Sequence, residues 1–131
     1  MPDDLVMPAD DAVTLAQQLI DEGRPFHAHE VLEAAWKAAP RDQRDLWKGL
    51  AQIAVGLTHA RRGNSHGAVA LLRRGANAVG GYARAAGESV SIDAAAVSRA
   101  ATQLADRIAA DGLDSVPADD LLLRLTPPDA G

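Results

Sequence analysis

Glycine and proline residues divide the chain into runs of helical periodicity. Gly23 and Gly63 each follow a run in which apolar residues recur every three or four positions, and Pro40 ends the run between them. No run alternates between apolar and polar residues as a half-buried strand would. The pattern predicts an all-α domain of about five helices, over residues 10–22, 25–38, 42–62, 64–79 and 91–112.

Residue types that cap helix N-termini precede four of these runs. The candidate caps are Asp10 or Asp11, Asp42, Asn64 or Ser65, and Ser91 or Asp93. The second run has Pro25 at its first position, where the missing N–H costs nothing. Gly80 and Gly81 disfavour a continuation of the fourth helix to Arg84.

The chain matches itself at an offset of 40 residues. The matched pairs are Ala16 with Gly56, Gly23 with Gly63, Ala28 with Ala68, Leu32 with Leu72, and Ala35 with Gly75. Small residues pair with small ones and leucine with leucine, as expected where the two helices of a hairpin cross closely. The spacing is similar to the helical hairpins of tetratricopeptide repeats. It predicts a compact bundle of two stacked hairpins, with the fifth helix capping the open end.

Composition narrows the class of protein. A chain of 131 residues is long enough for one domain with a proper core, and the sequence contains no cysteine for disulfide or thiolate chemistry. The N-terminal residues lack the pattern of a secretory signal, and no apolar run is long enough to span a bilayer, so a soluble, cytoplasmic protein is expected. We expect a flexible leader over residues 1–9, one helical domain over 10–112, and a C-terminal segment over 113–131 with a short helix and a disordered end.

Charge is segregated along the chain. Residues 1–40 carry a net charge of −6, residues 41–84 carry +6, and residues 85–131 carry −5. The arginine pairs Arg61-Arg62 and Arg73-Arg74 make RNA or anion binding one hypothesis. Nucleic acid is not the expected partner, because no aromatic residues interleave the arginines to stack on bases. Packing of acidic outer helices beside a basic central pair explains the pattern without a partner.

The second helical segment carries the best candidates for a site. Phe26, His29, Glu33 and Trp36 fall within about 80° of one another on a helix, and this mixture is unusual for a core face. Glu30 points about 100° away from His29 and is expected to be solvated.

The third segment carries a second polar stripe. Asp45, Gln52 and His59 recur at intervals of seven, opposite a leucine-rich stripe. If the two helices are neighbours, His29, Glu33, Gln52 and His59 are placed to converge. Three interpretations remain open: a buried hydrogen-bonded network, a divalent metal site with His29, Glu33 and His59 as ligands, and a groove for a small ligand or protein.

Other kinds of site have weaker support. The zinc signature H-E-x-x-H is absent, because Glu33 stands where its second histidine belongs. The serines lack the glycine-flanked turn of a nucleophile elbow. His27 and His66 lie at helix starts and are expected to be exposed, without a role.

Two ordered motifs resemble a known family. Phe26, His29, Glu30, Glu33 and Trp36 form an aromatic-x-x-H-E-x-x-E-x-x-W motif. A second block, with G-L-x-Q, a histidine and G-N-x-x-G-A, consists of Gly49, Leu50, Gln52, His59, Gly63, Asn64, Gly67 and Ala68. Both resemble the family named domain of unknown function 309, over roughly residues 10 to 110. The resemblance implies a helical bundle and no established activity.

The sequence thus predicts a small helical binding or scaffold module with a mixed aromatic and polar groove on its second and third helices, acting without a cofactor. The alternative is a metal-dependent, hydrolase-like enzyme, with the metal held by His29, Glu33 and His59 and with Gln52 or Glu30 in support. The partner, a protein or a small ligand, is not identified by the sequence, nor is the oligomeric state.

Overall fold

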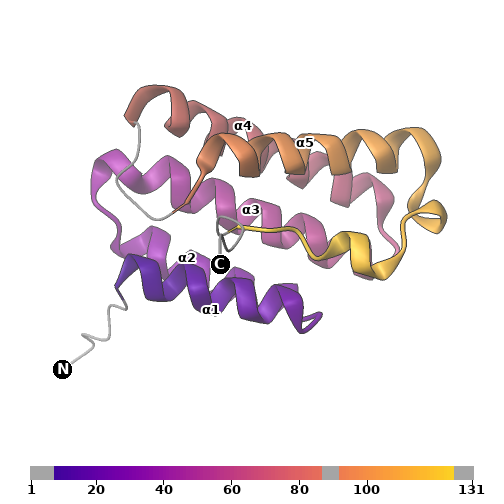
Figure 1. The fold of residues 1–131 in the computed structure, drawn as a ribbon, viewed down its shortest axis with the longest axis horizontal. Helices are drawn as coiled ribbons and strands as arrows, with labels where there is room; N and C mark the ends of the chain where they lie inside the picture. Colours follow the sequence, from indigo (N-terminus) through magenta and orange to yellow (C-terminus); the bar gives the residue numbers. More distant parts are fainter. Residues whose placement is uncertain (1–7, 87–91, 126–131) are drawn as a thin grey trace, which may run out of the picture.

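The computed structural model describes residues 8–86 and 92–125, and these ranges contain five α-helices and no strand. The helices are α1 (Ala9–Asp21), α2 (Pro25–Ala38), α3 (Arg44–Arg61), α4 (Ser65–Ala86) and α5 (Ala94–Asp111). Each helix packs on the next one along the chain, which gives an antiparallel array (Figure 1). The predicted all-α bundle, with α1–α2 and α3–α4 as its two hairpins and α5 against α4, is confirmed.

Glycine in the left-handed conformation ends the first helix of each hairpin. Gly23 has φ +77° and Gly63 has φ +80°, a region that other residues rarely adopt. The neighbouring helices then meet over small side chains, with Ala16, Ala28 and Ala68 fully buried. Residues paired by the 40-residue offset therefore hold similar positions in the two hairpins.

Glycines also let α3 and α4 approach closely. A Cβ atom on Gly75 would lie 2.6 Å from the carbonyl oxygen of Gly49, and a Cβ atom on Gly56 would lie 2.9 Å from Cγ of Leu72. These distances are shorter than van der Waals contact, so the backbones pack together at this crossing. Leu46, Leu50, Ile53 and Leu57 of α3 are fully buried in the core.

The fourth helix is longer than predicted. It continues through Gly80 and Gly81 to Ala86, although each glycine disfavours a helix by about 1 kcal/mol. Gly80 allows α5 to approach, since a Cβ atom there would lie 2.8 Å from Oγ of Ser98. Packing against α5 thus outweighs local propensity.

Two predicted caps are also wrong. A 3₁₀ turn at Arg41–Gln43 precedes α3, so Asp42 caps no α-helix, and α1 begins at Ala9 with Asp10 and Asp11 inside its first turn. Asp93 does cap α5, because its carboxylate accepts a hydrogen bond from the N–H of Ala96 at 3.1 Å. Ser91 lies outside the described residues.

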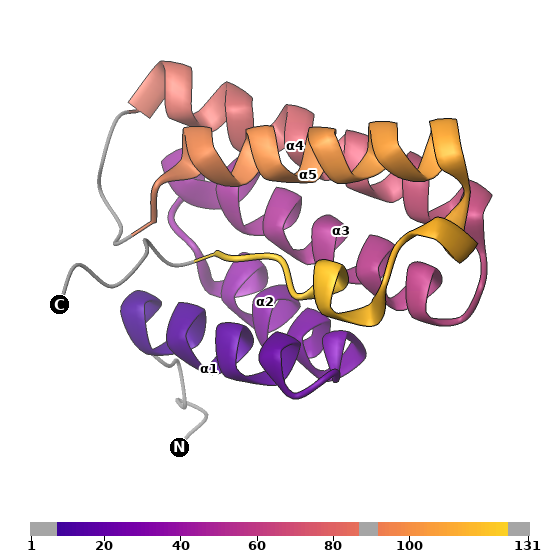
Figure 2. The same cartoon turned by 45° about the vertical axis from the view of Figure 1, so that its right-hand side comes forward.

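The segment after α5 packs onto the helices. Two 3₁₀ turns, Leu113–Ser115 and Ala118–Leu121, lead to an extended stretch that ends the described range at Leu125. Figures 1 and 2 show this stretch running between α1 and α5, across α3. The predicted short helical turn is therefore present in 3₁₀ form. The expected flexible leader and disordered end fall largely on residues 1–7 and 126–131, which lie outside the described ranges.

Within residues 8–86 and 92–125, none of the helices combines the length and the apolarity needed to span a bilayer.

Candidate functional site

A pocket of about 210 Å³ lies between α2 and α3, and its walls contain four of the predicted site residues. Helix α2 contributes His29, Glu33 and Trp36, which follow one another at helical spacing. Helix α3 contributes Gln52 to the same pocket. The structure therefore brings the two predicted polar stripes together at this point.

Two polar atoms of this pocket are buried without a partner. Nδ1 of His29 and Oε1 of Gln52 have no hydrogen-bond partner in the part of the chain that the structure describes. Nε2 of His29 lies 3.9 Å from Oε2 of Glu33, which is too long for a hydrogen bond. The side chains of the pocket therefore do not complete a hydrogen-bonded network among themselves. Each unpaired buried polar atom lowers the stability of the fold by about 1–3 kcal/mol.

The pocket also contains an aromatic face and two opposite charges. Nζ of Lys48 lies 5.9 Å from the centroid of the Trp36 ring, within range of a cation–π contact. The side chain of Glu33 is 41% exposed, whereas that of His29 is 22% exposed. The imidazole is thus more enclosed than the carboxylate, and Ala51 and Val55 complete an apolar part of the wall.

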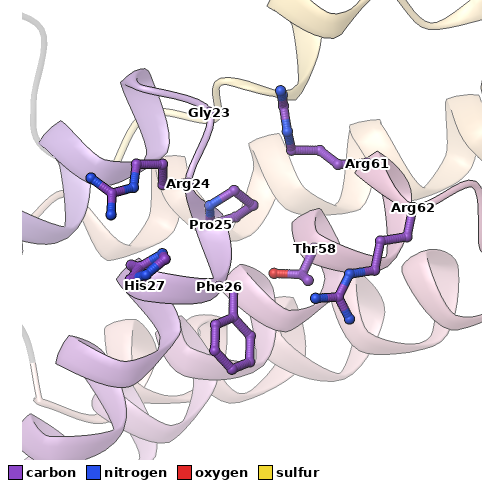
Figure 3. A pocket seen from close by; sticks show the side chains of 8 residues that line it. All are labelled: Gly23, Arg24, Pro25, Phe26, His27, Thr58, Arg61 and Arg62. Carbon is purple, nitrogen blue, oxygen red and sulfur yellow. The ribbon is translucent and has the colours of Figure 1, made fainter.

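Phe26 lines a neighbouring pocket at the turn that precedes α2. This second pocket, of about 250 Å³, lies against the C-terminal end of α3 and has Arg24, Arg61 and Arg62 in its walls. In Figure 3 the guanidinium of Arg62 lies beside the Phe26 ring, while Arg24 and Arg61 extend in other directions. The Phe26 ring is 45% exposed, and its centroid lies 5.8 Å from that of His29. It therefore stands at the boundary between the two pockets.

His59 has a local partner in the turn between α3 and α4. Its Nδ1 lies 3.1 Å from Nδ2 of Asn64, and Oδ1 of Asn64 accepts a hydrogen bond from the N–H of Gly67 at 3.0 Å. A Cβ atom on Gly67 would lie 2.9 Å from Cγ of His59. His59, Asn64 and Gly67 of the second motif thus fit together as parts of one helix-to-helix turn.

The predicted metal ligands do not form a cluster. Among residues 8–86 and 92–125, no group of three or more His, Asp or Glu side chains is placed to hold a metal ion. His29, Glu33 and His59 therefore do not meet as a ligand set. Glu30 is exposed, as are His27 and His66.

The arginine pairs differ in their surroundings. Nη2 of Arg73 lies 3.1 Å from Oδ1 of Asp106 on α5, so this arginine is part of an exposed ion pair between helices. Arg61 and Arg62 instead line the pocket beside Phe26.

Sequence reasoning missed three residues of the α2–α3 pocket, namely Lys48, Ala51 and Val55. A signal for them was present, because residues 48, 52 and 55 share one face of a helix at spacings of four and three. Of the predicted stripe through Asp45, Gln52 and His59, Gln52 lines this pocket, whereas Asp45 and His59 are not among its wall residues.

Fold and pocket together define an all-helical domain of stacked hairpins with a mixed aromatic and polar pocket between its second and third helices. Residues 13–71 match the model of a family described as a domain of unknown function, DUF309, and the resemblance seen in the sequence is thereby confirmed over this range. The matched range contains α2, α3 and the whole of the α2–α3 pocket.

One similar protein is the uncharacterized protein YpuF of Bacillus subtilis (strain 168). The two are 44% identical over 48 residues, which is 36% of this chain and 28% of YpuF. The chain thus matches less than a third of the length of that relative. No solved structure matches the chain.

Proposed function

We propose that the chain is a non-enzymatic binding module whose α2–α3 pocket takes a small polar ligand or a polar side chain of a partner protein. The observation that carries the proposal is the pair of buried, unpartnered atoms, Nδ1 of His29 and Oε1 of Gln52. Natural proteins pair almost all buried polar atoms with protein groups or ordered water, so these two atoms are places where a bound molecule can supply the partner.

Small torsional changes would turn both atoms towards a ligand. The terminal torsions of glutamine and histidine have broad energy wells, so rotation of the amide or the ring costs little. A ligand group that accepts or donates a hydrogen bond would then replace the missing partner. Under this proposal the unpaired atoms lower the stability of the free protein and leave the site able to bind, a trade-off that is common between stability and function.

The size and lining of the pocket limit what it takes. Its volume of about 210 Å³ is below the range of about 300–1,000 Å³ that is usual for drug-sized ligands. A single side chain or a small metabolite therefore suits it better than a cofactor. Trp36 offers a flat apolar surface, while Lys48 and Glu33 offer charges of both signs.

Under this proposal the stacked hairpins, with their tetratricopeptide-like spacing, are a scaffold that holds α2 against α3.

The metal-dependent alternative would need a third imidazole or carboxylate beside His29 and Glu33, and the remaining wall residues do not supply one.

Tryptophan fluorescence tests the proposal directly. The chain has two tryptophans, of which Trp36 lines the pocket and Trp47 is 2% exposed in the core. In a Trp47→Phe variant, Trp36 becomes the single reporter. A panel of N-acetyl amino-acid amides with polar side chains is titrated to millimolar concentration, and at least one is expected to change the emission of Trp36 saturably.

The same titration is repeated with two further variants of the reporter. Gln52→Leu is expected to abolish the change in emission, whereas His66→Ala, at an exposed position of α4, is expected to preserve it. If no member of the panel changes the emission of the folded reporter, the proposal is contradicted.

A further inference from the structure

The face made by α1, α3 and α5 holds an extended piece of chain. Residues 122–125 lie across this face, and both views show them between α1 and α5 (Figures 1 and 2). Leu121, Leu123 and Leu125 are buried, whereas Leu122 is half-buried and Arg124 is exposed. The alternation is that of a strand with one buried face, although no strand lies beside it in the described ranges.

A glutamine side chain takes the place of the missing neighbouring strand. Nε2 of Gln17 donates a hydrogen bond to the carbonyl oxygen of Leu123 at 3.2 Å, and the N–H of Leu125 donates one to Oε1 of Gln17. Gln17 is only 5% exposed, so both bonds are sheltered from water. The amide thus recognises the backbone of the segment and not its side chains.

Charged residues fix the ends of the segment. Nη1 of Arg107 on α5 lies 2.7 Å from Oδ2 of Asp120, and Nη2 of Arg124 lies 3.8 Å from Oδ2 of Asp21 on α1. Recognition therefore combines backbone hydrogen bonds, apolar contacts for alternate residues and opposite charges at the two ends. These are the means by which folded domains recognise extended peptides.

We infer that this face is a peptide-binding surface, and that it accepts in trans an extended peptide with leucines at alternate positions, an acidic residue before them and a basic residue between the last two. In the free chain its own segment, residues 116–125, is the occupant. Gln17, Asp21 and Arg107, which hold the segment, do not line the α2–α3 pocket, so this inference is independent of the proposed function.

The tethered segment has a large advantage over a free peptide. Linkage gives an effective concentration in the millimolar range, which raises apparent affinity by about 10²–10⁴-fold. A peptide in trans is therefore expected to bind appreciably only when the resident segment is released.

The test uses the full chain with Leu123→Asp and Leu125→Asp, which place two charges where the segment is buried. A fluorescent peptide with the sequence of residues 116–125 is titrated by anisotropy into this variant and into the unchanged chain. The variant is expected to bind the peptide at least about tenfold more tightly than the unchanged chain. Adding Gln17→Ala to the variant is expected to weaken that binding, and a peptide carrying the same two aspartates is expected not to bind. A folded variant that fails to bind the peptide would overturn the inference.

A second measurement applies if the double variant does not fold. The unchanged chain, labelled with ¹⁵N, is titrated with unlabelled peptide to several millimolar, roughly the concentration at which a free peptide competes with the tethered segment. The Leu125 amide and the Gln17 side-chain amide are followed by NMR. Exchange of these signals between a resident and a replaced form supports the inference, and signals that stay unchanged at those concentrations contradict it.

Discussion

Two glutamines on different helices are largely enclosed but differ in their hydrogen bonds. Gln17 of α1 uses both ends of its amide to hold the backbone at Leu123 and Leu125. Gln52 of α3 has a buried Oε1 without a partner in the described part of the chain. The first arrangement stabilises the fold, whereas the second is expected to destabilise it.

Gln17→Ala is expected to lower the free energy of unfolding by about 1–3 kcal/mol, because it leaves a buried carbonyl and a buried N–H unpaired. Urea unfolding followed by circular dichroism measures the change. Gln18→Ala is the matched control, since Gln18 is exposed and its amide donates a hydrogen bond to Glu22 one turn away. Equal losses for both variants would contradict the role given to Gln17.

The sequence was least informative about single residues. His29, Glu33, Trp36 and Gln52 could be predicted as neighbours, because each helix showed them as a stripe on one face. His59 could not be placed correctly, since a seven-residue stripe does not reveal that a turn asparagine lies beside it. Nothing in the sequence indicated the role of Gln17, because the two backbone groups that its amide holds lie 106 and 108 residues away along the chain.

At the scale of elements, the close crossing of α3 and α4 requires glycine at Gly75, whereas Gly81 near the end of α4 has no such constraint. A Cβ atom on Gly75 would lie 2.6 Å from the oxygen of Gly49 and 2.9 Å from the nitrogen of Ile53, both in the backbone of α3. Backbone atoms cannot turn aside as a side chain can, so the helices would have to separate. Among the described residues, a Cβ atom on Gly81 would instead meet only Nη2 of Arg84, at 4.0 Å.

The same substitution at these two positions is therefore expected to have opposite effects. Gly75→Ala should destabilise the protein by about 1–3 kcal/mol through overpacking. Gly81→Ala should stabilise it by about 0.5–1 kcal/mol, because alanine favours the helix and needs no extra space. Thermal unfolding of the two variants beside the unchanged chain checks both signs, and a stabilising Gly75→Ala would show that the crossing is looser than described.

The presence of the five helices and their arrangement in hairpins could be predicted, because apolar spacing and the paired glycines specify both locally. Helix ends were less predictable. The continuation of α4 through Gly80 and Gly81 depends on the approach of α5, and such a tertiary contact has no local signature. The caps at Asp10, Asp11 and Asp42 failed because Pro8 and the 3₁₀ turn after Pro40 lead into the helices instead.

For the whole molecule, the match to DUF309 coincides with the part that builds the α2–α3 pocket. Residues 13–71 contain both walls of the pocket, whereas α5 and the C-terminal segment lie outside the match. The C-terminal segment links α1 to α5 through Gln17 and Arg107 and so joins the two ends of the helical array. On this account the pocket is the binding site, and the array holds it in shape.

The most direct test of the binding account is the effect of one substitution at the two glutamines on the free energy of unfolding. Gln52→Leu removes an unpaired buried acceptor and replaces it with an apolar group of similar size, so the free energy of unfolding is expected to stay unchanged or to rise. Gln17→Leu, the matched control, is expected to lower it by more than about 1 kcal/mol. If Gln52→Leu causes a loss as large as Gln17→Leu does, then the Gln52 amide belongs to a closed structural network, and the pocket is not the binding site proposed for it.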